Sequence, residues 1–402
     1  MQLIFLLLFT LAVLTLGSVK IGPFSLRVYM TVLMLFFLII NKKTVSDKYL
    51  SINNTYIKLF LICIVALGIS LTLNGGLQEY DFFIKCLSHY LVSIVAYYAL
   101  DRCVKCESHI DSIVAIISII VVFDVIVTIL QYQNNPIGWG IGIVFSEESQ
   151  IELFTSYLVD HQSFEGVSKI PGIFGHPVNN GFFLAVATPM LISGIGKYNP
   201  KIKSLFYLFT ILMSLIALIL LQQRSAFFLV LIVLSYHLIR SLVNNLSRLF
   251  LPFTVFLTVA VIVLPTYLVD FDWSRLTSTD NSSRNDVWKI AYTFIINNPI
   301  FGDLPGYNKV ALYSAHNVFI DSLINSGIIG FIPLFILYVK TVVDSLQIMV
   351  KTRDVYARVF SYSVLICMGM GLFHNTSYLT GDVIIFIALA LMFKAQMLTK
   401  RN

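Results

Sequence analysis

Two arginines and a histidine stand beside apolar runs, where their side chains could act on an anionic substrate. His316 directly precedes an apolar run in Tyr313-Ser-Ala-His316-Asn317, Arg284 lies upstream in the same polar segment, and Arg224 separates two other apolar runs. The planar arginine side chain matches the oxygens of a phosphate and stays charged. Histidine titrates near neutral pH and can accept a proton. The pattern predicts that Arg224 and Arg284 hold a diphosphate and that His316 deprotonates an attacking hydroxyl.

Other polar residues fall at the same predicted face of the membrane. An ionisable residue inside a spanning segment is costly and therefore marks a candidate site. A cation near the end of a helix can also simply extend to the interface, which is an equal explanation for two of these residues, Arg27 and Lys85. We expect five residues to support the site: Arg27, Lys85, His176, Tyr313 and Asn317.

Asp124 and the cysteines have structural explanations. Asp124 falls in the middle of an apolar run, so we expect it to pair with a cation or to stay protonated, with a structural role ahead of a catalytic one. Cys103-Val-Lys-Cys106 has the CxxC spacing, but the sequence has no second pair to complete a zinc site. No HExxH motif is present, and we expect no metal and no cofactor.

The composition is that of an integral membrane protein. Of the 402 residues, 57% are hydrophobic and only 12% are charged, and the mean hydropathy is +0.85. In a soluble protein the net charge of +6 would suggest nucleic acid as a partner. Here basic residues retained on the cytoplasmic side explain it better, so we expect no nucleic-acid partner.

Apolar runs between polar breaks predict an all-α, polytopic fold of about twelve membrane-spanning helices in a single integral domain, residues 1–402. The predicted spans lie near residues 2–17, 24–41, 55–73, 81–100, 110–132, 174–196, 204–222, 225–242, 249–268, 317–340, 356–374 and 379–396.

Basic residues predict the orientation. With the N-terminus inside, every inward loop carries at least two Lys or Arg residues, so both termini are expected in the cytoplasm. Two long loops, residues 133–171 and 269–315, then lie outside. Loops of this length are usually functional or disordered. In the second loop, apolar residues at helical spacing predict a short amphipathic helix over residues 285–296 on the outer surface.

Several motifs together resemble the Wzy/WaaL superfamily of bacterial O-antigen polymerases and ligases. A block before the sixth predicted span, Pro171-Gly-x-Phe-Gly-His176-Pro-x-x-x-Gly181, fits the superfamily, as does Gln-Gln-Arg224 between two spans. The likeness covers roughly residues 165–340. Its main motifs, in order, are Arg284-x-x-x-Trp288-x-x-Ala291, Asn298-Pro-x-x-Gly302 and His316-Asn-x-x-x-Asp-x-x-x-x-x-Gly327-x-x-Gly330.

This resemblance implies a metal-independent, inverting glycosyltransferase of the GT-C type in the bacterial inner membrane, with a periplasmic active site. The donor would be an oligosaccharide linked to undecaprenyl diphosphate, and a chain-length regulator is a possible partner. By the superfamily pattern, His316 resembles the general base, and Arg224 and Arg284 resemble the diphosphate-binding arginines. We favour a polymerase of repeat units over a ligase that transfers the glycan to lipid A-core.

Two other classes of protein remain as alternatives. A transporter or flippase for polysaccharide precursors also has about twelve helices, but it usually carries its charges near mid-membrane in two related halves. Only Asp124 favours that class here. A structural partner of a polysaccharide-export complex is the other alternative, and it would not need the clustered histidines and arginines.

Overall fold

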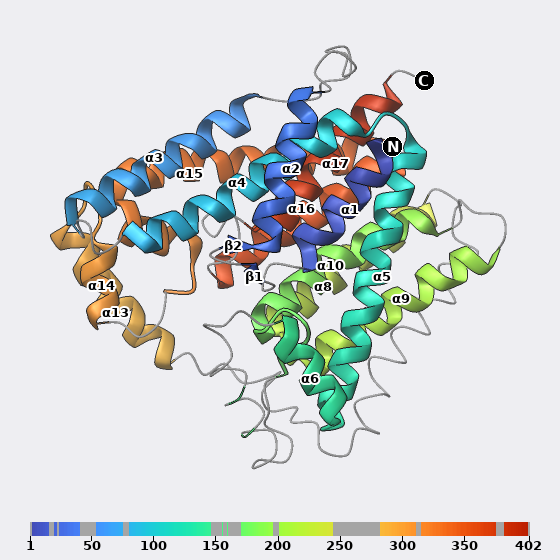
Figure 1. The fold of residues 1–402 in the computed structure, drawn as a ribbon, viewed down its shortest axis with the longest axis horizontal. Coiled ribbons are helices and arrows are strands. Elements are labelled where there is room, and N and C mark those ends of the chain that lie inside the picture. The colour runs from blue at the N-terminus through green and yellow to red at the C-terminus, as the bar shows by residue number, and fades with distance from the viewer. Residues whose placement is uncertain are drawn as a thin grey trace. The chain divides into compact units, whose positions relative to one another are not determined.

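The structure is a computed structural model of the chain (Figure 1). It describes residues 2–15, 20–21, 24–40, 54–74, 80–145, 155, 159, 170–195, 201–243, 282–310, 315–374 and 382–400. The chain divides into two compact units: unit 1 holds residues 1–9, 28–107 and 279–402, and unit 2 holds residues 10–27 and 108–278.

Unit 1 is helical. Two helices near the N-terminus are shared with unit 2 at their ends: α1 (Gln2–Thr15) and α2 (Leu26–Ile40). The remaining helices of unit 1 are α3 (Asn54–Asn74), α4 (Tyr80–Cys103), α13 (Ser282–Asn297), α14 (Leu304–Val310), α15 (Val318–Lys351), α16 (Val355–Phe373) and α17 (Val383–Thr399).

Unit 2 is also built from helices. They are α5 (Glu107–Tyr132), whose first residue belongs to unit 1, then α6 (Pro136–Phe145), α8 (Pro177–Leu191), η3 (Ile192–Gly194), α9 (Lys201–Leu220) and α10 (Arg224–Val243). A two-residue antiparallel ladder, β1 (Lys20–Ile21) with β2 (Phe24–Ser25), precedes α2 and is a small departure from the predicted all-α fold.

The apolar runs predict the helices well. Every predicted span within the described residues coincides with a helix, and the predicted span 249–268 lies outside them. Among the residues described, five helices are long and apolar enough to cross a membrane: Thr55–Asn74, Glu107–Tyr132, Ile202–Leu220, Val318–Lys351 and Val355–Phe373. The chain thus has the make-up of a polytopic helical membrane protein, while the total of twelve spans stays a prediction.

Three helices differ from the sequence reading or extend it. Helix α15 continues to Lys351, well beyond the predicted end near residue 340. Helix α6 lies inside the long connection 133–171, where no helix was foreseen, because its short, glycine-containing sequence lacks a helical signal. Helix α13 stands where the amphipathic segment 285–296 predicts a helix.

In unit 1, α15 packs against α3 and α16, and α17 packs against α16 and α4 (Figure 1). Helices α3 and α15 are antiparallel: near the end of α15, Asp344 accepts the Tyr56 hydroxyl at 2.7 Å, and at the other end of α3 the Asn74 amide donates to the carbonyl of Gly302 at 2.6 Å. Because the two helices run in opposite directions, the start of α3 lies beside the end of α15.

A buried ion pair joins α17 to α4. The Lys394 ammonium lies 3.9 Å from the Asp101 carboxylate, both side chains are fully buried, and the ammonium also donates to the Asp101 carbonyl. Burial of a charge is tolerated only when it is paired and hydrogen-bonded. Lys394, which falls within the predicted span 379–396, is therefore part of the helix packing.

Helix α15 is broken at Gly327, which has non-helical backbone angles (φ 57°, ψ −158°). In a regular helix the Ile328 N–H would donate to the Ile324 carbonyl. Instead it donates to the Pro299 carbonyl at 2.9 Å, and the Ile324 carbonyl accepts from the Asp303 N–H at 2.8 Å. The turn after α13 thus satisfies both backbone groups released by the break, which matters because an unpaired backbone group in an apolar region is costly.

This junction requires glycine on both sides. A Cβ on Gly327 would overlap the backbone of Ile300, and a Cβ on Gly302 would overlap the Ile324 carbonyl oxygen. Gly302 also has a positive φ of 68°. The glycines of Asn298-Pro-x-x-Gly302 and Gly327-x-x-Gly330 therefore allow two backbones to approach to hydrogen-bonding distance.

We expect Gly327→Ala to lower the free energy of unfolding by at least about 2 kcal/mol, because the alanine side chain meets the Ile300 backbone in a conformation that only glycine adopts readily. Gly140→Ala in α6 is the matched control, since a Cβ there has no neighbour within 4 Å. Thermal unfolding in detergent measures both, and equal unfolding temperatures for the two variants would contradict the junction.

Candidate functional site

His316 lies in unit 1, two residues before α15, in a left-handed conformation (φ 53°). A residue other than glycine adopts this conformation only when its surroundings impose it. The neighbouring Ala315 shows how. The Ala315 carbonyl accepts the Trp288 indole N–H at 2.8 Å, and the Ala315 N–H donates to the Asp321 carboxylate at 2.8 Å.

The two side chains that hold Ala315 come from different helices. Trp288 belongs to α13, and Asp321 lies in the first turn of α15, where only 5% of its surface is exposed. The Ala315 peptide groups are thus fixed on both sides. Trp288 and Asp321 thereby position the chain that carries His316.

On the other side of His316, Asn317 begins α15. Its side-chain oxygen accepts the N–H groups of Phe319 and Ile320 at 3.0 and 3.3 Å, as an N-cap residue does. Its amide also donates to the Leu372 carbonyl, at the end of α16, at 3.1 Å. Asn317 therefore links the His316 segment to α16 by a hydrogen bond.

The end of α16 brings a second histidine to this place. The ring centroids of His316 and His374 lie 6.2 Å apart in an edge-on arrangement. His374 is the C-cap of α16 and is buried. The two histidines are thus neighbours.

Helices α13 and α14 both pack against α15. The rings of Phe294 and Tyr307 meet edge-on at 5.7 Å, and the Asp303 carboxylate accepts the Gly306 N–H at the start of α14. Burial, assisted by the nearby Asp321 carboxyl, raises the pKa of Tyr307 to about 12. Tyr307 therefore stays protonated at neutral pH.

Three of the predicted residues of this unit are described only in part or not at all. Arg284 lies in the first turn of α13 and Lys85 lies in α4, but their side chains are outside the described residues. Tyr313 lies entirely outside them. Their roles stay predictions.

In unit 2, Arg224 is the first residue of α10 and is half-buried. The turn before it includes Gln222 in a left-handed conformation (φ 53°), which lets α10 fold back after α9. A Cβ on Gly181 of α8 would lie 2.6 Å from Gln223 Cγ. The turn that carries Arg224 thus packs closely on the first turns of α8.

His176 is the N-cap of α8: its Nδ1 accepts the Val178 N–H at 3.2 Å, and Pro177 is the first helical residue. This contact gives His176 a structural role, and a further role in a site stays a prediction. Arg27 lies in the first turn of α2 and is half-buried.

The segment before α8 is held by one face of α5. The Gln131 amide exchanges two hydrogen bonds with Gly172, at 2.9 and 3.2 Å, and also donates to the Gly138 carbonyl at 3.1 Å. One and two turns earlier on the same face are Thr128 and Asp124. These hydrogen bonds hold the Pro171–Gly181 block against α5.

Asp124 is fully buried and its hydrogen-bonding partners are neutral. Its carboxylate accepts the Ile173 N–H at 3.0 Å. With its Nδ2 turned toward the carboxylate, the Asn180 amide lies 2.7 Å from both Asp124 oxygens and accepts the Thr128 hydroxyl at 3.3 Å. Among the described residues, Asp124 thus holds the Pro171–Gly181 block through neutral donors. Of the two predicted alternatives, pairing with a cation or staying protonated, the structure does not show the first.

Sequence reasoning did not assign a role to Trp288 or Asp321, although both belong to the quoted motifs. An Asp in the first turn of a helix is a recognisable capping signal. Asp321 instead accepts a hydrogen bond from the Ala315 N–H, in the segment before the helix. Cys103 is buried and Cys106 is exposed, and both are free thiols.

Comparison with known proteins identifies a domain in the middle of the chain. Residues 208–335 match the family model described as O-antigen ligase. The matched segment contains Arg224, Arg284 and His316, and it ends after the Gly327 junction. The match confirms the resemblance to the superfamily of O-antigen polymerases and ligases. No curated protein matches the chain.

We expect Asp124→Ala to lower the free energy of unfolding by about 2–4 kcal/mol, because it leaves the Ile173 N–H and the Asn180 amide buried without an acceptor. Asp124→Asn keeps an oxygen for Ile173, and Asn180 can turn its own oxygen toward the new amide, so we expect a loss below about 1 kcal/mol. Thermal unfolding in detergent measures both variants. If asparagine is as harmful as alanine, the negative charge itself is needed for stability.

Proposed function

We propose that this chain, whose residues 208–335 match the family model described as O-antigen ligase, is a glycosyltransferase that polymerises lipid-linked repeat units of a surface polysaccharide. It transfers the growing glycan from undecaprenyl diphosphate to a sugar hydroxyl of the next lipid-linked unit. The observation that carries the proposal is the His316 segment, which is held in a left-handed conformation by partners on both sides.

In the proposed reaction His316 is the general base. Its imidazole takes the proton of the acceptor hydroxyl while the hydroxyl oxygen attacks the anomeric carbon of the donor. The bond between that carbon and the diphosphate oxygen breaks, and the diphosphate leaves with the electron pair. A single displacement of this kind inverts the anomeric centre. The neighbouring His374 and the Asn317 cap limit the directions in which the His316 ring can lie.

Arg224 and Arg284 are proposed to hold the diphosphate. Each belongs to the first turn of a helix, α10 and α13, where backbone N–H groups and the helix dipole also favour an anion. Two guanidinium groups stabilise the charge that develops on the leaving diphosphate. Arg27, Lys85, His176 and Tyr313 are proposed as supporting residues, and metal independence follows from the superfamily resemblance.

The packing of unit 1 is consistent with the predicted grouping of helix ends on two sides of the membrane. His316, His374 and Asn74 lie at the ends of helices that the sequence assigns to the periplasmic side. Tyr56, Lys340 and Asp344 meet at the opposite ends, which the sequence assigns to the cytoplasmic side. Residues expected on one side of the membrane therefore contact one another.

A ligase is the second candidate, because the matched family model is described as O-antigen ligase. A ligase uses the same donor and the same leaving group and differs in its acceptor, lipid A-core. The residues proposed for the donor serve both reactions equally.

We expect His316→Ala and Arg284→Ala to reduce polymer formation at least about a hundredfold while the protein stays inserted and abundant, because each removes a group that acts in the transition state. Lys289→Gln on α13 is the matched control, since Lys289 forms only an exposed pair with Asp286. The measurement is lipopolysaccharide banding in a deletion strain complemented with each variant. Full-length ladders from both His316→Ala and Arg284→Ala would remove the catalytic assignment.

The deletion strain itself separates the two candidates. Core with a single repeat unit indicates a polymerase. Bare core, with long polymer left on the lipid carrier, indicates a ligase.

We expect Asp321→Ala to lower turnover by about tenfold to a hundredfold with little change in KM, because it frees the Ala315 N–H and lets the His316 segment shift. Asp321→Asn retains a side-chain oxygen for that N–H and should keep most of the turnover. In vitro polymerisation kinetics with purified variants measure both, with quantified folded protein as the control. Equal loss in both variants would mean that the carboxylate has another function.

A further inference from the structure

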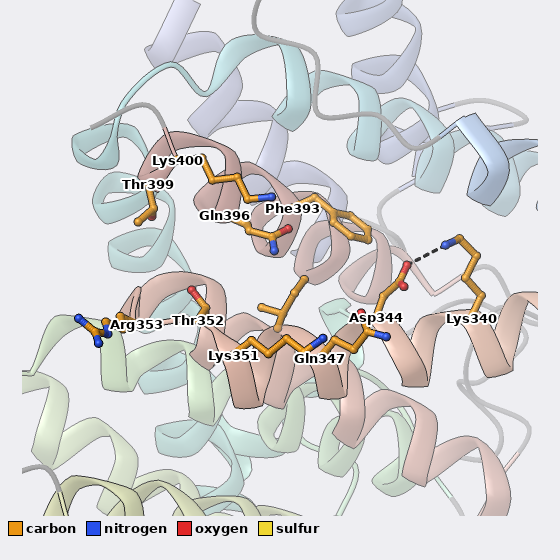
Figure 2. A pocket seen from close by; sticks show the side chains of 11 residues that line it. Lys340, Asp344, Gln347, Lys351, Thr352, Arg353, Phe393, Gln396, Thr399 and Lys400 are labelled. Atoms are coloured by element: carbon orange, nitrogen blue, oxygen red, sulfur yellow. Dashed lines mark hydrogen bonds and ion pairs between the residues drawn. The ribbon is translucent and has the colours of Figure 1, made fainter.

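A pocket of about 490 Å³ lies in unit 1 between the last turns of α15 and α17, away from His316 along α15. Four basic side chains line it: Lys340, Lys351, Arg353 and Lys400. Figure 2 shows the α15 residues on one wall and the α17 residues on the facing wall, with Arg353 at the end far from Lys340.

The charges of this pocket are unbalanced. The single carboxylate in its lining, Asp344, is already engaged by the Lys340 ammonium at 2.9 Å and by the Tyr56 hydroxyl at 2.7 Å. Within the described part of the chain, Lys351, Arg353 and Lys400 form no ion pair. Asp354, next to Arg353, adds a carboxylate at the edge of the pocket, where Thr399 donates a hydrogen bond to it. The basic side chains of the lining still outnumber the carboxylates, which favours the entry of an anion.

The rest of the lining combines amide donors with apolar surface. Gln347 and Gln396 contribute side-chain amides, and Phe393 and Ile348 contribute apolar surface. Arginine and amide groups together suit the several oxygens of a phosphate group. An apolar wall beside them suits a phosphate that is attached to a less polar body.

The pocket lies at the end of α15 that the sequence predicts to face the cytoplasm, because the predicted span 317–340 ends at Lys340. The pocket residues beyond Lys340 therefore reach the headgroup region. On the same stretch of α15, Val343, Leu346 and Val350 are exposed and can contact acyl chains.

We propose that this pocket binds a phosphate group, and that an anionic phospholipid headgroup supplies it. The bound headgroup bridges the ends of α15 and α17 through Lys351, Arg353 and Lys400. This site is independent of the proposed transfer reaction, because it shares no residue with the donor site.

The experiment compares the full-length protein in neutral detergent with the pocket variant Lys351→Gln/Arg353→Gln. Thermal unfolding is followed during titration with short-chain phosphatidylglycerol, with phosphatidylcholine of the same chain length, and with inorganic phosphate. We expect phosphatidylglycerol to raise the unfolding temperature of the wild type, and the pocket variant to need a concentration at least about tenfold higher for the same rise. Phosphatidylcholine should have no such effect.

Two further variants make the result specific. Lys58→Gln/Lys203→Gln removes the same charge from exposed lysines outside the pocket and should respond like the wild type. Lys351→Arg/Arg353→Lys keeps the charge and should retain binding, which separates loss of the site from loss of folding.

Each outcome decides the proposal. If inorganic phosphate gives the same pocket-dependent stabilisation as the lipid, the phosphate site stands and its source is soluble phosphate. If the wild type and the pocket variant respond equally to phosphatidylglycerol, the basic residues are only a solvated face and the proposal is wrong.

Discussion

The structure of unit 1 depends on one exchange of backbone hydrogen bonds. Where α15 breaks at Gly327, the Ile328 N–H does not bond to the Ile324 carbonyl as in a regular helix. Both groups instead form hydrogen bonds with the turn that follows α13. In an apolar environment such groups cannot turn to water, so the break exists only because this turn lies against it. The break in turn sets the direction of the first part of α15, which carries Asp321. The hydrogen bond from Ala315 to Asp321, next to His316, lies in this first part.

The two units position their functional groups by a common device. In each, a side chain from a helix captures the backbone of a polar segment just before the next helix begins. Asp321 and Trp288 hold Ala315 before α15, and Asp124 and Gln131 hold Ile173 and Gly172 before α8. Buried polar groups are costly unless they are fully hydrogen-bonded, so these contacts favour one arrangement of each segment over others.

Much of this architecture is visible in the sequence, because apolar runs and loop charges reflect the bilayer directly. Helices α5 and α16 end within a few residues of their predicted limits. The apolar pattern fails where other interactions decide. Helix α15 continues past Lys340, where the pair of that lysine with Asp344 one turn on adds a small stabilisation. Lys394 is buried beside Asp101, its partner from a distant segment. Motifs locate His316 and Arg224, but contacts between residues far apart in sequence, such as Trp288 with Ala315, cannot be deduced from spacing.

The break at Gly327 affects the direction in which the side chains of α15 point. A regular helix turns about 100° per residue, so one residue added or lost rotates everything beyond it. Gly327 interrupts that propagation. The Asn317 cap and the turn after α13 set the direction in which side chains of Val318–Ser326 point. The segment from Ile328 onward independently exposes Ile332, Phe335 and Val339. The surface facing lipid and the surface facing the histidines can therefore diverge in sequence independently.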